Sequence, residues 1–198
     1  MHQIIFIHGF SGIGKSTLAK KLHEYLKGVY IEQYMIPDFK TKDGKTEITG
    51  KEEDETLYAL MVANIKEFAR LNYYNIIALD FNPVRLIDIP HDFKGYDYLI
   101  LHLVCDNKEQ NLKQMLNRGE GLIDEKMIEN DYKRKLKYPQ PQLPNEYNIN
   151  VTNKTPDEVF DMAVKIIKTK KSKLDYNYNK PDKKCFGTWV KADQNDDL

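Results

Sequence analysis

Short apolar runs alternate with longer amphipathic stretches over the first 170 residues or so of this chain. Continuous runs of β-branched and other apolar residues predict buried strands at 4–7, 76–79 and 98–104, and further strands at 29–31 and 147–151. Apolar residues recur at helical spacing in the segments between them, which predicts amphipathic connecting helices. Because strands joined by such helices form right-handed crossovers, we expect an α/β fold: a five-stranded parallel sheet with helices on both faces.

Local signals at several helix starts agree with this periodicity. The long helix that follows the polar segment 32–51 begins with four consecutive acidic residues, starting at Glu52. Negative charge there suits the positive end of the helix dipole. Thr155 is placed as the N-cap of the last helix, with Glu158 completing a capping box. Asn107 and Gln110 are placed to cap the helix after the strand at 98–104.

Three segments depart from the strand–helix alternation. Residues 32–51 are polar and read as an active-site or lid loop on the surface. Residues 122–136 form a weaker, densely basic helical pattern before a proline-rich break. From Ser172 onward the sequence is polar with scattered aromatic residues, which predicts a mobile tail. We therefore expect one domain at 1–171, with a helical lid at about 118–138 and a tail at 172–198.

Composition limits the classes of partner. The 198 residues include 30 Lys and Arg and 30 Asp and Glu, so the formal net charge is zero and no general attraction to nucleic acid or anionic membranes is expected. Cys105 and Cys185 fit neither a disulfide framework nor a zinc site. No apolar run approaches the roughly 18 residues of a membrane span. These features indicate a cytoplasmic protein with reduced thiols and no membrane partner.

A phosphate-binding motif lies between the first strand and the first helix. Gly9, Gly14, Lys15 and Ser16 match every fixed position of G-x-x-x-x-G-K-[ST]. The glycines let backbone N–H groups turn inward around phosphates, and the new helix points its positive end at the same place. We expect a nucleoside triphosphate to bind this loop through Gly9, Ser11, Gly12, Ile13, Gly14, Lys15, Ser16 and Thr17.

Within this motif, Lys15 would reach the β- and γ-phosphates, and the Ser16 hydroxyl would coordinate Mg²⁺. Asp80 ends the third strand directly after four apolar residues. From that position a carboxylate can hold Mg²⁺, or a water bound to it, on the side opposite Ser16. The expected ligands are therefore ATP and Mg²⁺, with Ser16 and Asp80 as the metal-binding residues.

With these residues in place, the chain resembles the small P-loop kinases, the group that includes shikimate kinase, gluconokinase, adenylylsulfate kinase, and nucleotide and polynucleotide kinases. The resemblance covers roughly residues 1–170 and rests on the loop, on Asp80, on Asn117-Arg118-Gly119 after the fourth strand, and on the closing strand–loop–helix unit. It implies a Mg²⁺-dependent enzyme that transfers the γ-phosphoryl group of ATP to a small-molecule or nucleotide acceptor.

The resemblance also assigns roles to residues outside the loop. Arg118 matches the lid arginine that stabilises the transferring phosphoryl group, which makes it a catalytic candidate beside Lys15. The adenine-packing loop falls on Thr152-Asn153-Lys154, so Asn153 is a nucleotide-binding candidate. Asp38 stands where relatives carry the general base or hydroxyl anchor for the acceptor, and Arg85 could grip an anionic substrate.

Two departures from the family pattern bear on the acceptor and the lid. Many relatives carry a second lid arginine a few residues after the first, whereas this chain has Gly121 and Leu122. Nucleotide kinases usually have Asp-Arg at the end of the third strand, whereas this chain has Asp80-Phe81, which argues against a close nucleotide kinase.

Two alternatives stay open. The basic lid of residues 126–137 could grip the backbone of a nucleic acid, as in a polynucleotide 5′-end kinase, although the neutral net charge disfavours this. The chain could instead be a non-catalytic ATP-binding protein that uses its aromatic tail as a docking segment. A GTP switch is disfavoured because no Asn-Lys-x-Asp motif supplies the guanine-reading aspartate. The tail aromatics are Tyr176, Tyr178, Phe186 and Trp189.

Overall fold

The computed structural model describes residues 2–10, 12–32, 35, 41, 43–79, 83–116 and 142–181. These residues form one parallel sheet with the strand order β2-β3-β1-β4-β5. The first strand in sequence is therefore central, and the carboxyl ends of all five strands lie along one edge. The strands are β1 (Ile4–Gly9), β2 (Val29–Glu32), β3 (Asn75–Ala78), β4 (Tyr98–Val104) and β5 (Glu146–Asn150).

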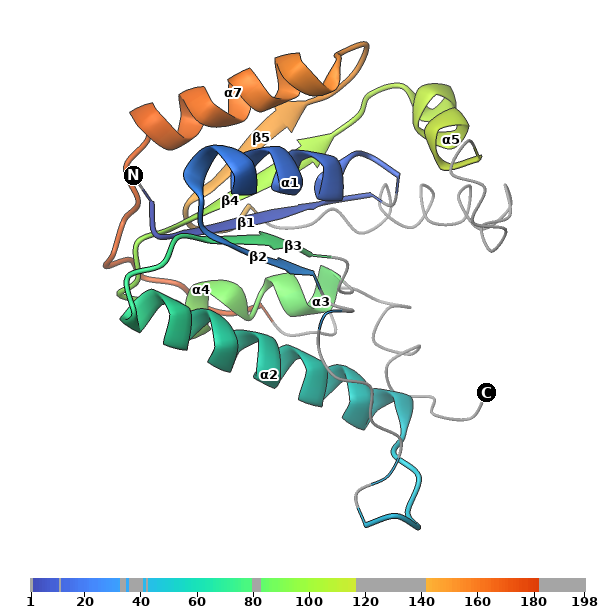
Figure 1. Ribbon diagram of the computed structural model, residues 1–198, viewed down its shortest axis with the longest axis vertical. Coiled ribbons are helices and arrows are strands. Elements are labelled where there is room, and N and C mark those ends of the chain that lie inside the picture. Colours follow the sequence, from blue (N-terminus) through green and yellow to red (C-terminus); the bar gives the residue numbers. More distant parts are fainter. Residues whose placement is uncertain are drawn as a thin grey trace.

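Helices cover both faces of the sheet, as Figure 1 shows. One face carries α1 (Lys15–Leu26) and α7 (Pro156–Thr169). The other carries α2 (Gly50–Arg70) with the short α3 (Pro83–Leu86) and α4 (Ile89–Asp92), while α5 (Lys108–Leu116) lies beyond the carboxyl edge. The predicted fold class is confirmed. The predicted lid helix lies outside the described residues.

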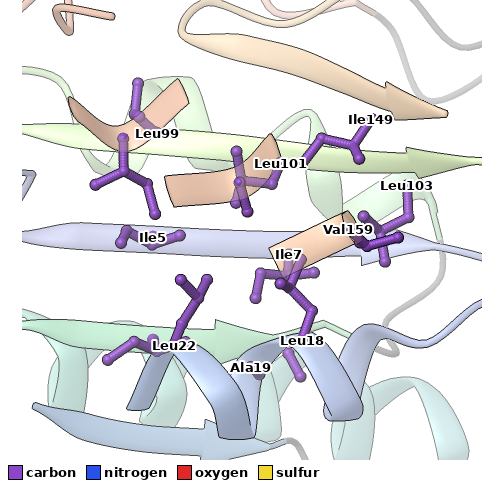
Figure 2. Close-up of a cluster of buried hydrophobic side chains, with 14 of the residues drawn as sticks. Ile5, Ile7, Leu18, Ala19, Leu22, Leu99, Leu101, Leu103, Ile149 and Val159 are labelled. Carbon is purple, nitrogen blue, oxygen red and sulfur yellow. The ribbon is translucent and has the colours of Figure 1, made fainter. Parts of the chain in front are cut away.

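The two helical layers bury opposite sides of the same strands. Successive strand residues point to opposite faces, so in β1 Ile4 and Phe6 pack toward α2, whereas Ile5 and Ile7 pack toward α1 and α7. Figure 2 shows the second cluster, in which Leu18 and Leu22 of α1 close over the sheet. Each fully buried aliphatic side chain stabilises the folded state by about 1.5–3 kcal/mol relative to an exposed one. This two-sided burial explains why the strand sequences are continuously apolar.

Helix caps confirm most of the local signals. The side chain of Thr155 accepts a hydrogen bond from the backbone N–H of Glu158 (3.3 Å), and the Glu158 carboxylate accepts one in return from the backbone N–H of Thr155 (2.7 Å). Asn107 accepts from the backbone N–H of Gln110 (3.0 Å). The helix expected from Glu52 instead begins at Gly50, because Thr49 forms its own capping box with that glutamate.

Residues 172–181 pack against the domain, contrary to the mobile tail that the sequence suggested. The Tyr176 hydroxyl donates to the backbone carbonyl of Pro90 (2.6 Å) and lies 2.8 Å from the hydroxyl of buried Tyr98. The Tyr178 hydroxyl donates to the carbonyl of Ile87 (3.0 Å). The polar composition misled the prediction because the tyrosine rings join the core on the α2 side. Residues 182–198 lie outside the described part of the chain.

Among the helices within the described ranges, none combines the length and the apolar character needed to cross a bilayer.

We expect Tyr176→Phe to lower the free energy of unfolding by about 1–2 kcal/mol, because it leaves the buried Tyr98 hydroxyl and the Pro90 carbonyl without this partner. The measurement is urea denaturation followed by circular dichroism. The matched control is Tyr73→Phe, since Tyr73 is 50% exposed and should change stability little. Equal stability of both variants and the wild type would contradict the docked position of residues 172–181.

Candidate nucleotide-binding site

The loop after β1 has a backbone that requires glycine at two of its positions. Gly9 has φ 148° and Gly14 has φ 105°, values that residues with a Cβ rarely adopt. A Cβ on Gly9 would lie 2.6 Å from the carbonyl oxygen of Leu103 in β4, so the loop starts in close contact with the neighbouring strand. A Cβ on Gly14 would meet nothing within 4 Å, which leaves open space above the first turn of α1.

The groups next to this open space carry positive charge or point N–H donors toward it. Lys15 is only 5% exposed, and its Nζ donates to the carbonyls of Gly9 (3.3 Å) and Phe10 (3.1 Å), so the ammonium group lies over the loop itself. Leu18 N donates to Gly14 O (3.0 Å), and the preceding amides of α1 therefore have no acceptor within the helix. Backbone N–H groups and a buried ammonium group together form a site suited to an anion.

A pocket of about 200 Å³ adjoins the loop, between the start of α1 and the connection from β5 to α7. Its wall combines apolar side chains with the polar residues Thr17, Gln114 and Lys154. A pocket that offers both apolar and polar groups beside an anion site has the character required by a base attached to a phosphate chain. The remaining lining residues are Gly12, Ile13, Gly14, Leu18, Val151, Pro156 and Val159.

The three residues expected to pack against adenine have different positions. Lys154 lines the pocket. Asn153 adopts a positive φ of 56°, and its backbone N–H donates to the Gln110 side chain of α5 (2.9 Å). The Thr152 hydroxyl accepts from the backbone N–H of Asp106 (2.9 Å). Asn153 and Thr152 therefore fasten the loop to the β4–α5 connection, and Lys154 forms the wall.

Of the predicted metal-binding pair, Ser16 lies in the first turn of α1 beside the loop. Asp80 lies outside the described residues, as do Ser11 of the loop, the acceptor candidate Asp38 and the lid candidate Arg118. The described structure therefore brings together Gly9, Gly12, Ile13, Gly14, Lys15, Ser16 and Thr17 of the predicted nucleotide site.

Arg85, the expected anion grip, is engaged inside the protein. Its Nε donates to Asp54 (2.6 Å) in α2, and its Nη1 lies 3.7 Å from Asp88. The guanidinium also lies over the Tyr58 ring. Burial, followed by the charge of Asp92, raises the pKa of Tyr58, so this hydroxyl stays protonated and donates to Asp92 (2.9 Å). Two carboxylates thus match the charge of Arg85.

Sequence reasoning missed Glu32, which lies at the carboxyl end of β2. The side chain is 3% exposed and accepts a hydrogen bond from the Tyr30 hydroxyl. A usable signal was present, because Glu32 follows an apolar strand directly, as Asp80 does. Gln114 was also missed, since nothing in a helical pattern shows which side chain reaches a neighbouring pocket.

Gly9→Ala should lower the free energy of unfolding by about 2–4 kcal/mol, because the new Cβ adds a backbone clash to an unfavourable φ. Gly44→Ala is the matched control: its φ is +77°, but a Cβ there meets nothing within 4 Å, so the loss should be about 1 kcal/mol. Thermal and urea denaturation measure both. Equal losses would show that the approach of Gly9 to β4 does not matter.

Solved structures share this architecture at low sequence identity. A gluconokinase from Sinorhizobium meliloti 1021 matches with a TM-score of 0.60 at 12% identity, over 83% of this chain and 92% of that one. A sugar kinase from Janibacter sp. HTCC2649 matches with a TM-score of 0.61 at 15% identity, over 85% and 95%. An uncharacterized protein from Eubacterium ventriosum ATCC 27560 matches with a TM-score of 0.55 at 17% identity, over 86% and 100%.

At the level of sequence, neither a protein-family model nor a curated protein matches the chain. The structural likeness therefore shows the fold alone, an α/β fold shared with the gluconokinase and the sugar kinase, and this is the fold class that the sequence predicted.

Proposed function

We propose that this chain is a P-loop kinase that uses ATP and Mg²⁺ to phosphorylate a hydroxyl group of a small-molecule acceptor. The observation that carries the proposal is the position of Lys15. Its side chain is buried at the end of a loop whose backbone requires glycine, and an open pocket adjoins that loop. The kinase fold of the similar structures supports it. The charge and shape of this site fit a nucleoside triphosphate.

Binding would exchange weak internal contacts for stronger ones. The Lys15 ammonium now donates to two neutral carbonyls, and its transfer to the β- and γ-phosphate oxygens would form charge-assisted hydrogen bonds. The backbone N–H groups at the start of α1 would donate to the same phosphates. The adenine would occupy the pocket beside Lys154.

The Ser16 hydroxyl fits a Mg²⁺ site, because it lies in the first turn of α1 next to the phosphate cradle. Asp80 would hold the ion from the end of β3, as the sequence predicted. When bound, Mg²⁺ supplies positive charge that offsets the charge of the β- and γ-phosphates. Arg118 would add positive charge from the lid as the phosphoryl group moves.

A carboxylate near the acceptor hydroxyl would orient that hydroxyl and accept its proton late in the transfer. The sequence proposed Asp38 for this role. Glu32 is a second candidate, because it lies at the carboxyl edge of the sheet, the edge at which β1 leads into the phosphate-binding loop. The Tyr30 hydroxyl donates to Glu32 and would hold the carboxylate in one orientation.

The charges on the α2 side favour an uncharged acceptor over a phosphorylated one. Arg85 was the expected anion grip, but Asp54 and Asp88 already match its charge. Two of the similar structures are a gluconokinase and a sugar kinase, which agrees with a hydroxyl-rich acceptor. We therefore rank sugars and nucleosides above nucleotides and polynucleotide ends.

The non-catalytic alternative loses part of its basis. It required an aromatic tail that is available for docking, whereas Tyr176 and Tyr178 are bonded to the domain.

Lys15→Ala should weaken Mg-ATP binding about 10- to 100-fold, because it removes charge-assisted hydrogen bonds to the phosphates. Isothermal titration calorimetry measures this. Lys20→Ala is the matched control, since Lys20 lies on the same helix and is exposed. If the wild type binds no Mg-ATP, or if both variants bind it as the wild type does, the proposed nucleotide site is wrong.

With an acceptor identified from pooled sugars and nucleosides, Glu32→Gln should lower kcat about 10²- to 10⁴-fold and leave Mg-ATP binding unchanged. Glutamine keeps an oxygen for the Tyr30 hydroxyl, so the fold should persist. Asp38→Asn is the parallel variant, measured in the same assay. A loss confined to Asp38→Asn would return the role to Asp38, and full activity in both variants would exclude a carboxylate base.

A further inference from the structure

Three metal-ligand side chains meet on the face of the sheet opposite α1. His8 in β1 and His102 in β4 are direct partners in the strand register, and their rings stack with centroids 4.2 Å apart. Glu146 of β5 joins them: its Oε1 lies 2.8 Å from His8 Nε2 and 3.6 Å from His102 Nδ1. By strand alternation His8 shares the α2 side with Ile4 and Phe6.

Burial and hydrogen bonding fix these groups in place. The side chains of His8 and Glu146 are 4% and 6% exposed, and that of His102 is 28% exposed, which leaves one open side. The second oxygen of Glu146 accepts the backbone N–H of Leu143 (2.8 Å), which fixes the carboxylate plane. Such support orients a ligand before metal binds.

The ligand atoms lie near one another, but not at the spacing of a tetrahedral site, so small side-chain movements would bring them onto one ion. A metal ion with bonds of about 2.0–2.1 Å holds its ligand atoms about 3.3–3.4 Å apart. The two nitrogen–oxygen distances, 2.8 and 3.6 Å, lie on either side of that value, and ligand atoms of all three residues lie within 4.8 Å of one another. A hydrogen bond to the Glu146 oxygen would require only one of the two histidines, whereas a metal site uses both.

We propose that His8, His102 and Glu146 form a binding site for a divalent transition-metal ion of the Zn²⁺ class. Two imidazole nitrogens and one carboxylate oxygen suit such an ion, and the exposed side of His102 leaves a fourth position for water. This site differs from the proposed Mg²⁺ site, because Mg²⁺ prefers oxygen ligands and Ser16 lies on α1, across the sheet.

The proposed metal site lies next to the start of the phosphate-binding loop. His8 directly precedes Gly9, and the three ligands come from three neighbouring strands. A bound ion would join the carboxyl-terminal parts of β1 and β4 to the start of β5, and hold the base of the phosphate-binding loop. Metal binding should therefore raise the melting temperature, with or without a nucleotide.

The test uses the tag-free, chelator-treated full chain titrated with Co²⁺ and then with Zn²⁺, in the absence of ATP. We expect the intense visible absorption of four-coordinate Co²⁺, its displacement by Zn²⁺, and a melting temperature raised by several degrees. His102→Ala should weaken Zn²⁺ binding at least about tenfold, and Glu146→Gln should do the same. Because no nucleotide is present, this outcome does not depend on the proposed kinase activity.

The matched control is His91→Ala, which removes a histidine whose side chain is 74% exposed and should bind Zn²⁺ as the wild type does. His102 is the most exposed of the three ligands, so His102→Ala should fold, and far-UV circular dichroism checks this. The proposal is overturned by weak six-coordinate Co²⁺ absorption in the wild type, or by equal Zn²⁺ affinity in His102→Ala and the wild type.

Discussion

The close packing of Gly9 against β4 is the constraint on which the phosphate-binding loop depends. A Cβ at this position would lie 2.6 Å from the Leu103 carbonyl, so the turn out of β1 can lie against the neighbouring strand only with glycine. Because β1 is central and paired on both sides, its position is fixed by two registers, and its last residues, His8 and Gly9, pair with β4. The start of α1, and with it Lys15, is therefore fixed relative to the whole sheet.

The sheet separates two chemical environments. On one face, residues of α1, α5 and α7 line the pocket beside the loop, and its wall combines apolar and polar groups. On the other face, polar groups are gathered into internally matched sets: Arg85 with Asp54 and Asp88, and Glu146 with His8 and His102. Such groups remain buried in ionised or hydrogen-bonded form only because partners reach them from other elements.

The C-terminal segment extends this matching. Lys180 pairs with Asp88, which also faces Arg85, and Tyr176 covers the hydroxyl of Tyr98. The segment thus covers the α2 side of the domain with polar contacts at its ends and aromatic rings between them. A polar composition therefore did not mean a lack of structure, since Tyr176 and Tyr178 pack against the core.

Local patterns in the sequence determined the strands, most helix starts and the glycine-rich loop after the first strand. The reason is that the apolar runs of the strands, the capping box of Thr155 and the spacing of Gly9, Gly14, Lys15 and Ser16 each involve residues close together in the chain. The pairing of His8 with His102 and Glu146, the capture of Arg85 by Asp54, and the docking of Tyr176 join residues far apart in sequence. Only the tertiary structure decided these contacts, because strand order and register, not sequence spacing, bring such residues together.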